Sequence, residues 1–425
     1  MSPSNDTSRS SRGRRPFQRL RAWWTSWPIL VRGTSLLLVP FMAITGMMAW
    51  RLWHEMRIRQ PIKAKGELTM GRSPVSPQVR LQVTRVLRDD HIKLLSPLES
   101  LILRKPVDAD VATLAQLGTL QELNIVRGDL SSQGLHQIRD LDHLESLYLE
   151  NDRIIDDGLQ GLPSCGKLNR LKLIGQLTPE ALKPLVRCNA LTELHLDAGY
   201  YEHSSNESLQ KRLTGHHMAV VARIPNLRTL VITSNDFPDI DLGNLQTARN
   251  LETLYVDSVA LNGDALNALG RMNRLTHLTL EVSTARPEAL SHLTGFPHLK
   301  SLELTGAGVR SEHLINLHKL PRLESLSLVR ADLRGSLAAL TRLPALKHLT
   351  LDLAALPSDG LQQLGVLPGL ASISLAMTDL EETPPDELQR HFPNLTQAPE
   401  PTPKPEFDYY KWVVPQGNQP GGGFF

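Results

Sequence analysis

The chain has few aromatic residues, few cysteines and none of the motifs that mark common enzyme classes. Aromatic residues make up 5% of the sequence, and the two cysteines are Cys165 and Cys188. Two thiols alone do not supply the four ligands of a structural zinc site. No Walker motif, H-E-x-x-H, G-x-S-x-G or kinase signature is present, and Gly306-Ala-Gly308 lacks the third glycine of a dinucleotide-binding fingerprint. We therefore expect the protein not to be an enzyme and to have no catalytic residues, cofactor or metal site.

The chain also has little net charge, but this charge is unevenly distributed. The formal net charge is +2, yet residues 1–65 hold 12 Lys/Arg against 2 Asp/Glu, and the remainder holds 34 against 42. The positive charge belongs to the N-terminal segment, where it flanks an apolar run. The rest of the chain is acidic overall, so we expect no nucleic-acid partner.

Residues 27–53 are predicted to form a single transmembrane helix. Within this range, residues 33–50 are 18 residues without a charge, which as a helix span about 27 Å. Tryptophans stand near both ends, as in the interfacial belts of membrane proteins. Seven positive residues precede the run and five follow it, so we expect a cytoplasmic N-terminus and an extracytoplasmic remainder. A cleavable signal peptide is the alternative, although no clear cleavage site follows.

Four further segments have the composition of tails and connectors. Residues 1–26 are basic and Ser-rich and are predicted to be disordered. Residues 54–80 contain several prolines and glycines and are predicted to form a linker, followed by an N-terminal cap at 81–97. Residues 397–425 are rich in proline and glycine, which predicts a second disordered tail.

The rest of the chain repeats one phrase. Leu98-Glu-Ser-Leu-Ile-Leu103 has the pattern L-x-x-L-x-L, which returns eleven more times at intervals of 22 to 24 residues, except for one interval of 36. A fixed period of this length is typical of a solenoid. Further phrases start at Leu120, Leu144, Leu168, Leu191, Leu227, Leu251, Leu275, Leu299, Leu323, Leu346 and Leu370.

This pattern resembles a leucine-rich repeat protein over about residues 94–396, and we place the repeat domain at 98–396. The resemblance is to short, ribonuclease-inhibitor-like repeats. It implies an α/β solenoid, a horseshoe with parallel strands on the concave side and helices on the convex side. The cysteine-rich caps of many extracellular members are excluded by the two cysteines. Where many members have a buried asparagine, this chain has other residues, such as Asp152.

The unit Leu299 to Arg322 illustrates the expected secondary structure. Its leucines alternate with polar residues over the phrase, which predicts a short strand with the leucines pointing inward. Ser311 is predicted to cap a helix that Pro321 ends. Thr178-Pro179-Glu180 is predicted to begin the helix of its own unit in the same way, with the hydroxyl as cap and proline at the first helical position.

The candidate binding site combines outward strand positions with the residues inserted in the long interval. Tyr148 and Tyr255 share the outward middle position of their strands, and the interval of 36 residues places an insertion near 199–212. Aromatic residues on a concave face beside an aromatic loop resemble a recognition patch. The family resemblance implies a protein or peptide ligand on this face. The candidate residues are Tyr148, Lys172, His195, Tyr200, Tyr201, His203 and Tyr255.

Several alternatives remain open. The tyrosines can cluster by chance, or the inserted loop can pack on itself. The repeats can equally serve as a structural scaffold of the cell envelope without one specific ligand. Cys165 and Cys188 occupy equivalent positions of neighbouring repeats. They are therefore either two buried thiols or, outside the cytoplasm, a disulfide between adjacent repeats.

Overall fold

The computed structural model describes residues 68–73, 76–83 and 98–394, the last range with gaps. The chain divides into two units, Met1–Gly66 and Glu67–Phe425, and every described residue belongs to the second. The predicted transmembrane helix at 27–53, both predicted tails and most of the predicted cap lie outside the described residues. Among the helices that the structure describes, none is long and apolar enough to cross a membrane. The gaps are residues 113, 155, 199–212, 234–236, 262, 286–289, 291–292, 294, 365–366, 368, 379–387 and 389.

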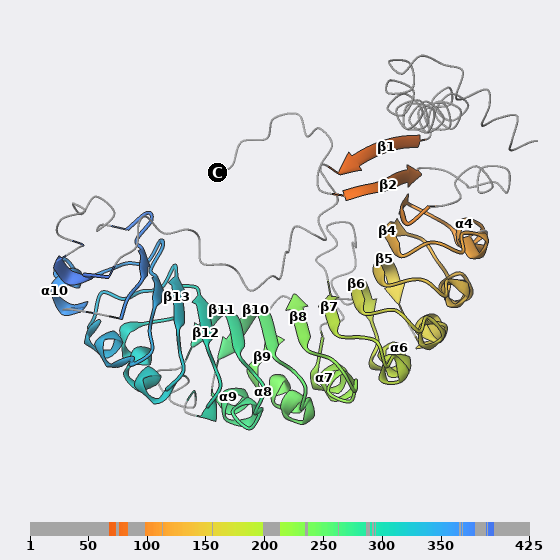
Figure 1. Cartoon of the computed structure of the whole chain (residues 1–425). Helices are drawn as coiled ribbons and strands as arrows, with labels where there is room; N and C mark the ends of the chain where they lie inside the picture. Colours follow the sequence, from red (N-terminus) through yellow and green to blue (C-terminus); the bar gives the residue numbers. More distant parts are fainter. Residues whose placement is uncertain are drawn as a thin grey trace, which may run out of the picture. The chain divides into compact units, whose positions relative to one another are not determined.

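Each of the twelve leucine phrases carries one strand of a single sheet, and these strands run parallel to one another (Figure 1). The prediction of twelve parallel strands is therefore confirmed. A two-residue strand, β9 (Phe237–Pro238), also pairs with β10. The twelve strands are β3 (Ser100–Arg104), β4 (Glu122–Gly128), β5 (Ser146–Ile154), β6 (Arg170–Leu177), β7 (Glu193–Asp197), β8 (Thr229–Thr233), β10 (Thr253–Leu261), β11 (His277–Ala285), β12 (Ser301–Thr305), β13 (Ser325–Val329), β14 (His348–Thr350) and β15 (Ser372–Ser374).

The sheet begins before the first leucine phrase. Strands β1 (Leu68–Ser73) and β2 (Ser76–Val83) form an antiparallel hairpin, and β2 pairs with β3 in parallel. These strands lie in the range predicted as linker and in the first residues of the predicted cap. Pairing with β2 satisfies the backbone hydrogen-bonding groups along one side of β3, which would otherwise form an open sheet edge. The hairpin therefore extends the sheet by two strands beyond the repeats.

The core of the repeat unit consists of stacked leucine side chains. Leu299, Leu302 and Leu304 are fully buried, and the alternating outward residues of β12 are partly exposed. The same phrase positions are buried in the other repeats, so each leucine packs on its equivalent one strand away, at about 4.8 Å. Replacing one inward leucine by alanine is expected to cost roughly 2–5 kcal/mol, felt mainly by adjacent repeats.

Short helical segments form the second layer, on the outer side of the curved sheet (Figure 1). Many of them are 3-10 helices instead of α-helices, because each repeat leaves few residues between strands. The α-helices are α4 (Asp108–Ala112), α5 (Ser132–His136), α6 (Pro179–Leu182), α7 (Gly215–Val221), α8 (Asp239–Leu242), α9 (Asp264–Leu269) and α10 (Gly360–Leu364). The 3-10 helices are η1 (Leu114–Gln116), η2 (Gln137–Asp140), η3 (Asp156–Leu159), η4 (Leu162–Ser164), η5 (Lys183–Arg187), η7 (Gly243–Thr247), η9 (Ser311–Lys319) and η10 (Ala338–Arg342).

One predicted helix start is confirmed and one is wrong. The Thr178 hydroxyl accepts a hydrogen bond from the Ala181 amide at 3.2 Å, and α6 begins at Pro179. Ser311, by contrast, is the first residue of η9, and the residue before it is the cap. There His313, the third residue of η9, accepts the amide of Arg310 at its Nδ1 at 2.9 Å, so a side chain inside the first turn bonds back to the cap residue.

A buried asparagine connects two repeats one residue before the position expected from the family pattern. Asn151 is 2% exposed; its Oδ1 accepts the Leu130 amide at 2.8 Å, and its Nδ2 donates to the Leu130 carbonyl at 3.1 Å. Counting along the repeat assigned Asp152 to the buried-asparagine position of the family, because a strand without irregularity was assumed. The register of β5 in fact shifts against β4 between Leu149 and Asn151, and against β6 between Glu150 and Arg153.

The interval of 36 residues leaves the sheet intact. Strands β7 and β8 pair directly, with His195 opposite Val231, although 199–212 lie between them in the chain. After the insertion the ordinary pattern resumes, because α7 follows and Leu213, Met218, Val221 and Ile224 are buried. The insertion is thus confined to the connection that leaves β7, as predicted.

Candidate functional site

The middle outward positions of successive strands form a row across the sheet. Tyr148 on β5 lies opposite Lys172 on β6, and Lys172 lies opposite His195 on β7. His195 lies opposite Val231 on β8, and Val231 lies opposite Tyr255 on β10. The prediction that these candidate residues share one row is confirmed. The two tyrosines are not neighbours, however, because three strands separate them.

Tyr148 and Lys172 form the first contact within the row. The Lys172 ammonium nitrogen lies 5.5 Å from the centroid of the Tyr148 ring, within the range of a cation–π interaction. Lys172 is only 7% exposed. Its burial lowers the pKa of the ammonium group, and the nearby carboxylates of Asp197 and Glu150 act in the opposite direction. The charge of Lys172 is therefore balanced within the face itself.

His195 is bonded to the strand beyond the insertion. Its Nε2 lies 2.7 Å from the hydroxyl oxygen of Thr233, and the residue is 2% exposed. Burial, followed by the positive charge of Lys172, lowers the pKa of His195 well below its ordinary value. The ring is therefore neutral near pH 7. Lys172 and His195 are both candidate residues and both are buried, Lys172 against the Tyr148 ring and His195 against Thr233.

A second row of outward residues is acidic. Asp197 lies two residues after His195 on β7 and pairs with Thr233. Asp257 lies two residues after Tyr255 on β10, directly after Val256, which pairs with Ile232. Both carboxylates therefore occupy the outward position that follows the aromatic row. Glu281 on β11 hydrogen-bonds with Asp257. Burial, that hydrogen bond and the charge of Asp257 raise the pKa of Glu281. Asp197 and Glu150 continue the row toward β5, with Thr233 and Ile174 at the positions between the carboxylates. Four carboxylates therefore lie beside the row of Tyr148 and Tyr255.

The described residues contain only part of the predicted site. Tyr148 and Tyr255 are half-buried on the sheet face. Tyr200, Tyr201 and His203 belong to 199–212, outside the described residues, so their proximity to the row stays a prediction. Within the described part of the chain, no group of three or more His, Cys, Asp or Glu side chains is arranged to hold a metal ion.

The sequence reading missed the acidic row and the buried valine in the middle of the aromatic row. Val231 is 1% exposed although it occupies an outward position, between His195 and Tyr255. Asp257 and Glu281 carried a usable signal: each lies two residues after the middle outward position of its phrase. From β5 to β11 this position holds four carboxylates, with Ile174 and Thr233 between them.

The two cysteines are free, buried thiols. Cys165 is 3% exposed with its Sγ 3.3 Å from the Ile138 carbonyl, and Cys188 is 5% exposed with its Sγ 3.9 Å from the Pro184 carbonyl. Burial raises the pKa of Cys165 to about 12 and that of Cys188 to about 11. Of the two alternatives, the structure therefore has the pair of thiols and not the disulfide.

The repeated phrase, the parallel register of its strands and the outer helical layer fit the architecture of a leucine-rich repeat solenoid. No protein-family model matches the chain. No curated protein sequence matches it either. Two solved structures are similar to part of the chain. An internalin from Listeria monocytogenes is 18% identical with a TM-score of 0.41, covering 72% of this chain and 88% of its own. A leucine-rich repeat protein from Leptospira interrogans is 17% identical with a TM-score of 0.34, covering 73% and 92%.

Proposed function

We propose that this chain is a membrane-anchored, non-catalytic protein-interaction platform that binds a protein or peptide on the strand face of its repeats. One observation carries the proposal: Tyr148 and Tyr255 lie in one row of outward positions, beside a row of carboxylates. Aromatic side chains supply large contact areas in protein interfaces, and ordered charges select the partner. The strands hold both rows at a regular spacing of about 4.8 Å.

The charge of the face suggests the chemistry of the ligand. Glu150, Asp197, Asp257 and Glu281 lie beside the aromatic row. Among the described residues of the aromatic row, Lys172 is the one lysine or arginine, and it is buried near Glu150 and Asp197; Arg127 also lies 3.9 Å from Glu150. A ligand with lysine or arginine side chains would complement these carboxylates, whereas an acidic ligand would be repelled. The partner we propose is therefore a basic segment of a protein or peptide.

The proposal that the chain is not an enzyme rests on how its titratable groups are used. Lys172 is engaged with the Tyr148 ring and with nearby carboxylates, and His195 is bonded to Thr233. Each group has a structural partner, and His195, whose partner is the Thr233 hydroxyl, is only 2% exposed. Catalysis of group transfer requires a nucleophile and a base that a substrate can reach.

The membrane anchor is proposed from the sequence of residues 27–53, with the N-terminus in the cytoplasm and the repeats outside it. Protease treatment of sealed membrane vesicles of known orientation tests this arrangement. Digestion of the repeats in right-side-out vesicles, with protection of the N-terminal tail, supports the proposal. Extraction of the intact chain by carbonate at high pH would contradict the anchor.

The binding proposal is tested by crosslinking from the face in membranes. The full chain is produced with a photo-reactive amino acid at Tyr255, and in a second sample at Ile315, which is exposed in the outer layer. We expect one dominant protein to be crosslinked from position 255, and we expect that protein not to be crosslinked from position 315. In parallel, the variant with Tyr148, Tyr200, Tyr201 and Tyr255 all changed to Ala should lose that protein while keeping its circular dichroism spectrum. Retention of every partner by this folded variant would favour a structural scaffold of the envelope instead.

A further inference from the structure

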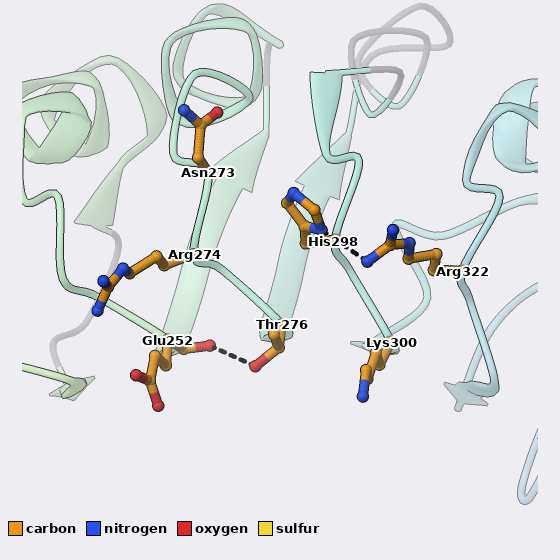
Figure 2. Close-up of a pocket in the computed structure, with 7 residues that line it drawn as sticks. All are labelled: Glu252, Asn273, Arg274, Thr276, His298, Lys300 and Arg322. Carbon is orange, nitrogen blue, oxygen red and sulfur yellow. Dashed lines mark hydrogen bonds between the residues drawn. The ribbon is translucent and has the colours of Figure 1, made fainter.

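A second surface, separate from the strand face, forms a groove along the turns that lead into four neighbouring strands. Its volume is about 310 Å³. Figure 2 shows the side chains of consecutive turns side by side, with Glu252 and Lys300 on either side of Thr276 and with His298 and Arg322 pointing toward each other. The turns are those before β10, β11, β12 and β13. The lining residues are Glu252, Asn273, Arg274, Thr276, His298, Lys300 and Arg322.

The groove carries an excess of positive charge. Arg274, Lys300 and Arg322 line it, and Glu252 is its single carboxylate. That carboxylate lies 3.5 Å from the guanidinium group of Arg228, outside the groove. Arg274 and Lys300 form no ion pair with any residue that the structure describes. Two cations of the groove are thus available to a ligand.

Arg322 is held in place by a hydrogen bond. Its Nη1 donates to Nδ1 of His298 at 2.9 Å (Figure 2). An imidazole nitrogen that accepts this bond is unprotonated, so Nε2 of the same ring carries the hydrogen and remains a donor. The arginine keeps its charge. Arginine and histidine donors together therefore face the same groove as Lys300.

The positive charge of the groove ends abruptly on both sides. One turn before it, the cation Arg228 is paired with Glu252; one turn after it, Lys347 is paired with Glu324 at 2.8 Å. From the turn of Arg274 to that of Arg322 is two strand spacings, or about 10 Å. This length fits a few consecutive acidic side chains and does not suit a long polyanion.

From this arrangement, we infer that the groove binds the carboxylate side chains of a short acidic segment of a partner protein. Guanidinium and ammonium groups form charge-assisted hydrogen bonds with carboxylates. A nucleic acid or an anionic membrane would extend well beyond the groove, over a chain whose residues 66–425 hold 34 basic against 42 acidic residues. Those long ligands would be repelled there. This site is additional to the proposed face, which favours the opposite charge.

The test measures binding of a fluorescein-labelled peptide of about eight glutamate and aspartate residues to the full chain in detergent, by fluorescence anisotropy at low salt. The double variant Arg274→Gln, Lys300→Gln is compared with Arg223→Gln, Lys319→Gln, which changes the net charge equally outside the groove. All four side chains are exposed, so both proteins should stay folded. We expect about tenfold weaker binding for the groove variant, which corresponds to about 1.4 kcal/mol for the two lost ion contacts, and little change for the control.

The charge-reversed variant Arg274→Glu, Lys300→Glu should abolish binding of the acidic peptide. Equal losses in the groove and control variants would overturn the inference, because binding would then follow overall charge. Absence of peptide binding to the unmodified chain would overturn it as well. Tighter, groove-dependent binding of a single-stranded oligonucleotide or of phosphatidylserine vesicles would overturn the assignment to an acidic protein segment. A basic peptide should remain insensitive to the groove variants, which separates this site from the strand face.

Discussion

The ammonium nitrogen of Lys172 lies 5.5 Å from the centre of the Tyr148 ring, on the adjacent strand in direct register. This contact helps to explain how a lysine that is only 7% exposed is accommodated in the sheet. The negative face of the aromatic ring and the carboxylates of Glu150 and Asp197 compensate for the water that the ammonium group has lost. Lys172 therefore contributes to the packing of this face.

Replacing the Tyr148 ring should destabilise the repeats through Lys172. We expect Tyr148→Leu to lower the free energy of unfolding by about 0.5–2 kcal/mol, because the buried ammonium group loses its cation–π partner. Tyr148→Phe keeps the ring and removes the hydroxyl, whose hydrogen bond to Glu150 is long at 3.5 Å, so it should cost little. Urea unfolding of the full chain followed by circular dichroism measures both. Equal costs for the two variants would show that the ring does not act on Lys172.

Mild acid should destabilise the fold through buried histidines. His217 Nδ1 accepts the Thr214 amide at 3.0 Å, and its Nε2 lies 3.0 Å from the Leu177 carbonyl, so the neutral ring bridges two repeats. Burial is the largest cause that lowers the pKa of His217 below 6.5, and His216 acts in the same direction. Glu180 and the two backbone hydrogen bonds oppose the shift. The pKa of His195 is lowered further.

The sign follows from proton linkage. As the pH falls below 6.5, the unfolded chain binds protons at these rings before the folded chain does. The contribution of the two neutral histidines to the free energy of unfolding is therefore fully present above pH 6.5 and declines as the pH falls. Each such histidine accounts for up to about 1.4 kcal/mol per pH unit. Urea unfolding at about pH 7.5 and 5.5 checks the slope. His217→Gln, which binds no proton, should flatten it, and an unchanged slope in this variant would contradict the role of His217.

Gly306 should tolerate no side chain. Its φ is +124°, and an added Cβ would overlap the Val282 carbonyl oxygen of the preceding repeat. Gly306→Ala should therefore cost about 1–3 kcal/mol or more from backbone strain. Gly118→Ala is the matched control, because nothing lies within 4 Å of the added Cβ. Similar thermal unfolding of the two variants would contradict this account. The result would also explain the Gly306-Ala-Gly308 sequence as a packing requirement.

Both cysteines should be unreactive in the folded chain and fully reactive after unfolding. Burial raises their pKa values to about 12 and about 11, so the thiolate is scarce at neutral pH. We expect maleimide labelling to add no group to the native protein and two groups in denaturant without reducing agent, as counted by mass spectrometry. A denatured, unreduced protein that labels at neither cysteine would instead indicate a disulfide.

Periodicity alone was enough to predict most of the fold. Each L-x-x-L-x-L phrase contains an alternation of apolar and polar residues, and each one forms a strand. Counting along the phrases also placed Tyr148, Lys172, His195 and Tyr255 in one row, since parallel strands of equal register align equivalent positions. The helical layer was predicted less well, because segments this short take α or 3-10 form according to local packing, as η9 does after Arg310.

The sequence by itself determined the number of strands formed by the repeats, their parallel direction and the row of the sheet to which each of their residues belongs. Only the tertiary structure decided which outward residues are available, because burial depends on the neighbour one strand away. Lys172 is covered through its contact with Tyr148, and His195 meets Thr233, 38 residues later in the chain. The cationic groove likewise collects side chains from four separate turns. A local pattern specifies each turn, but the sum of their charges exists only after the repeats have stacked.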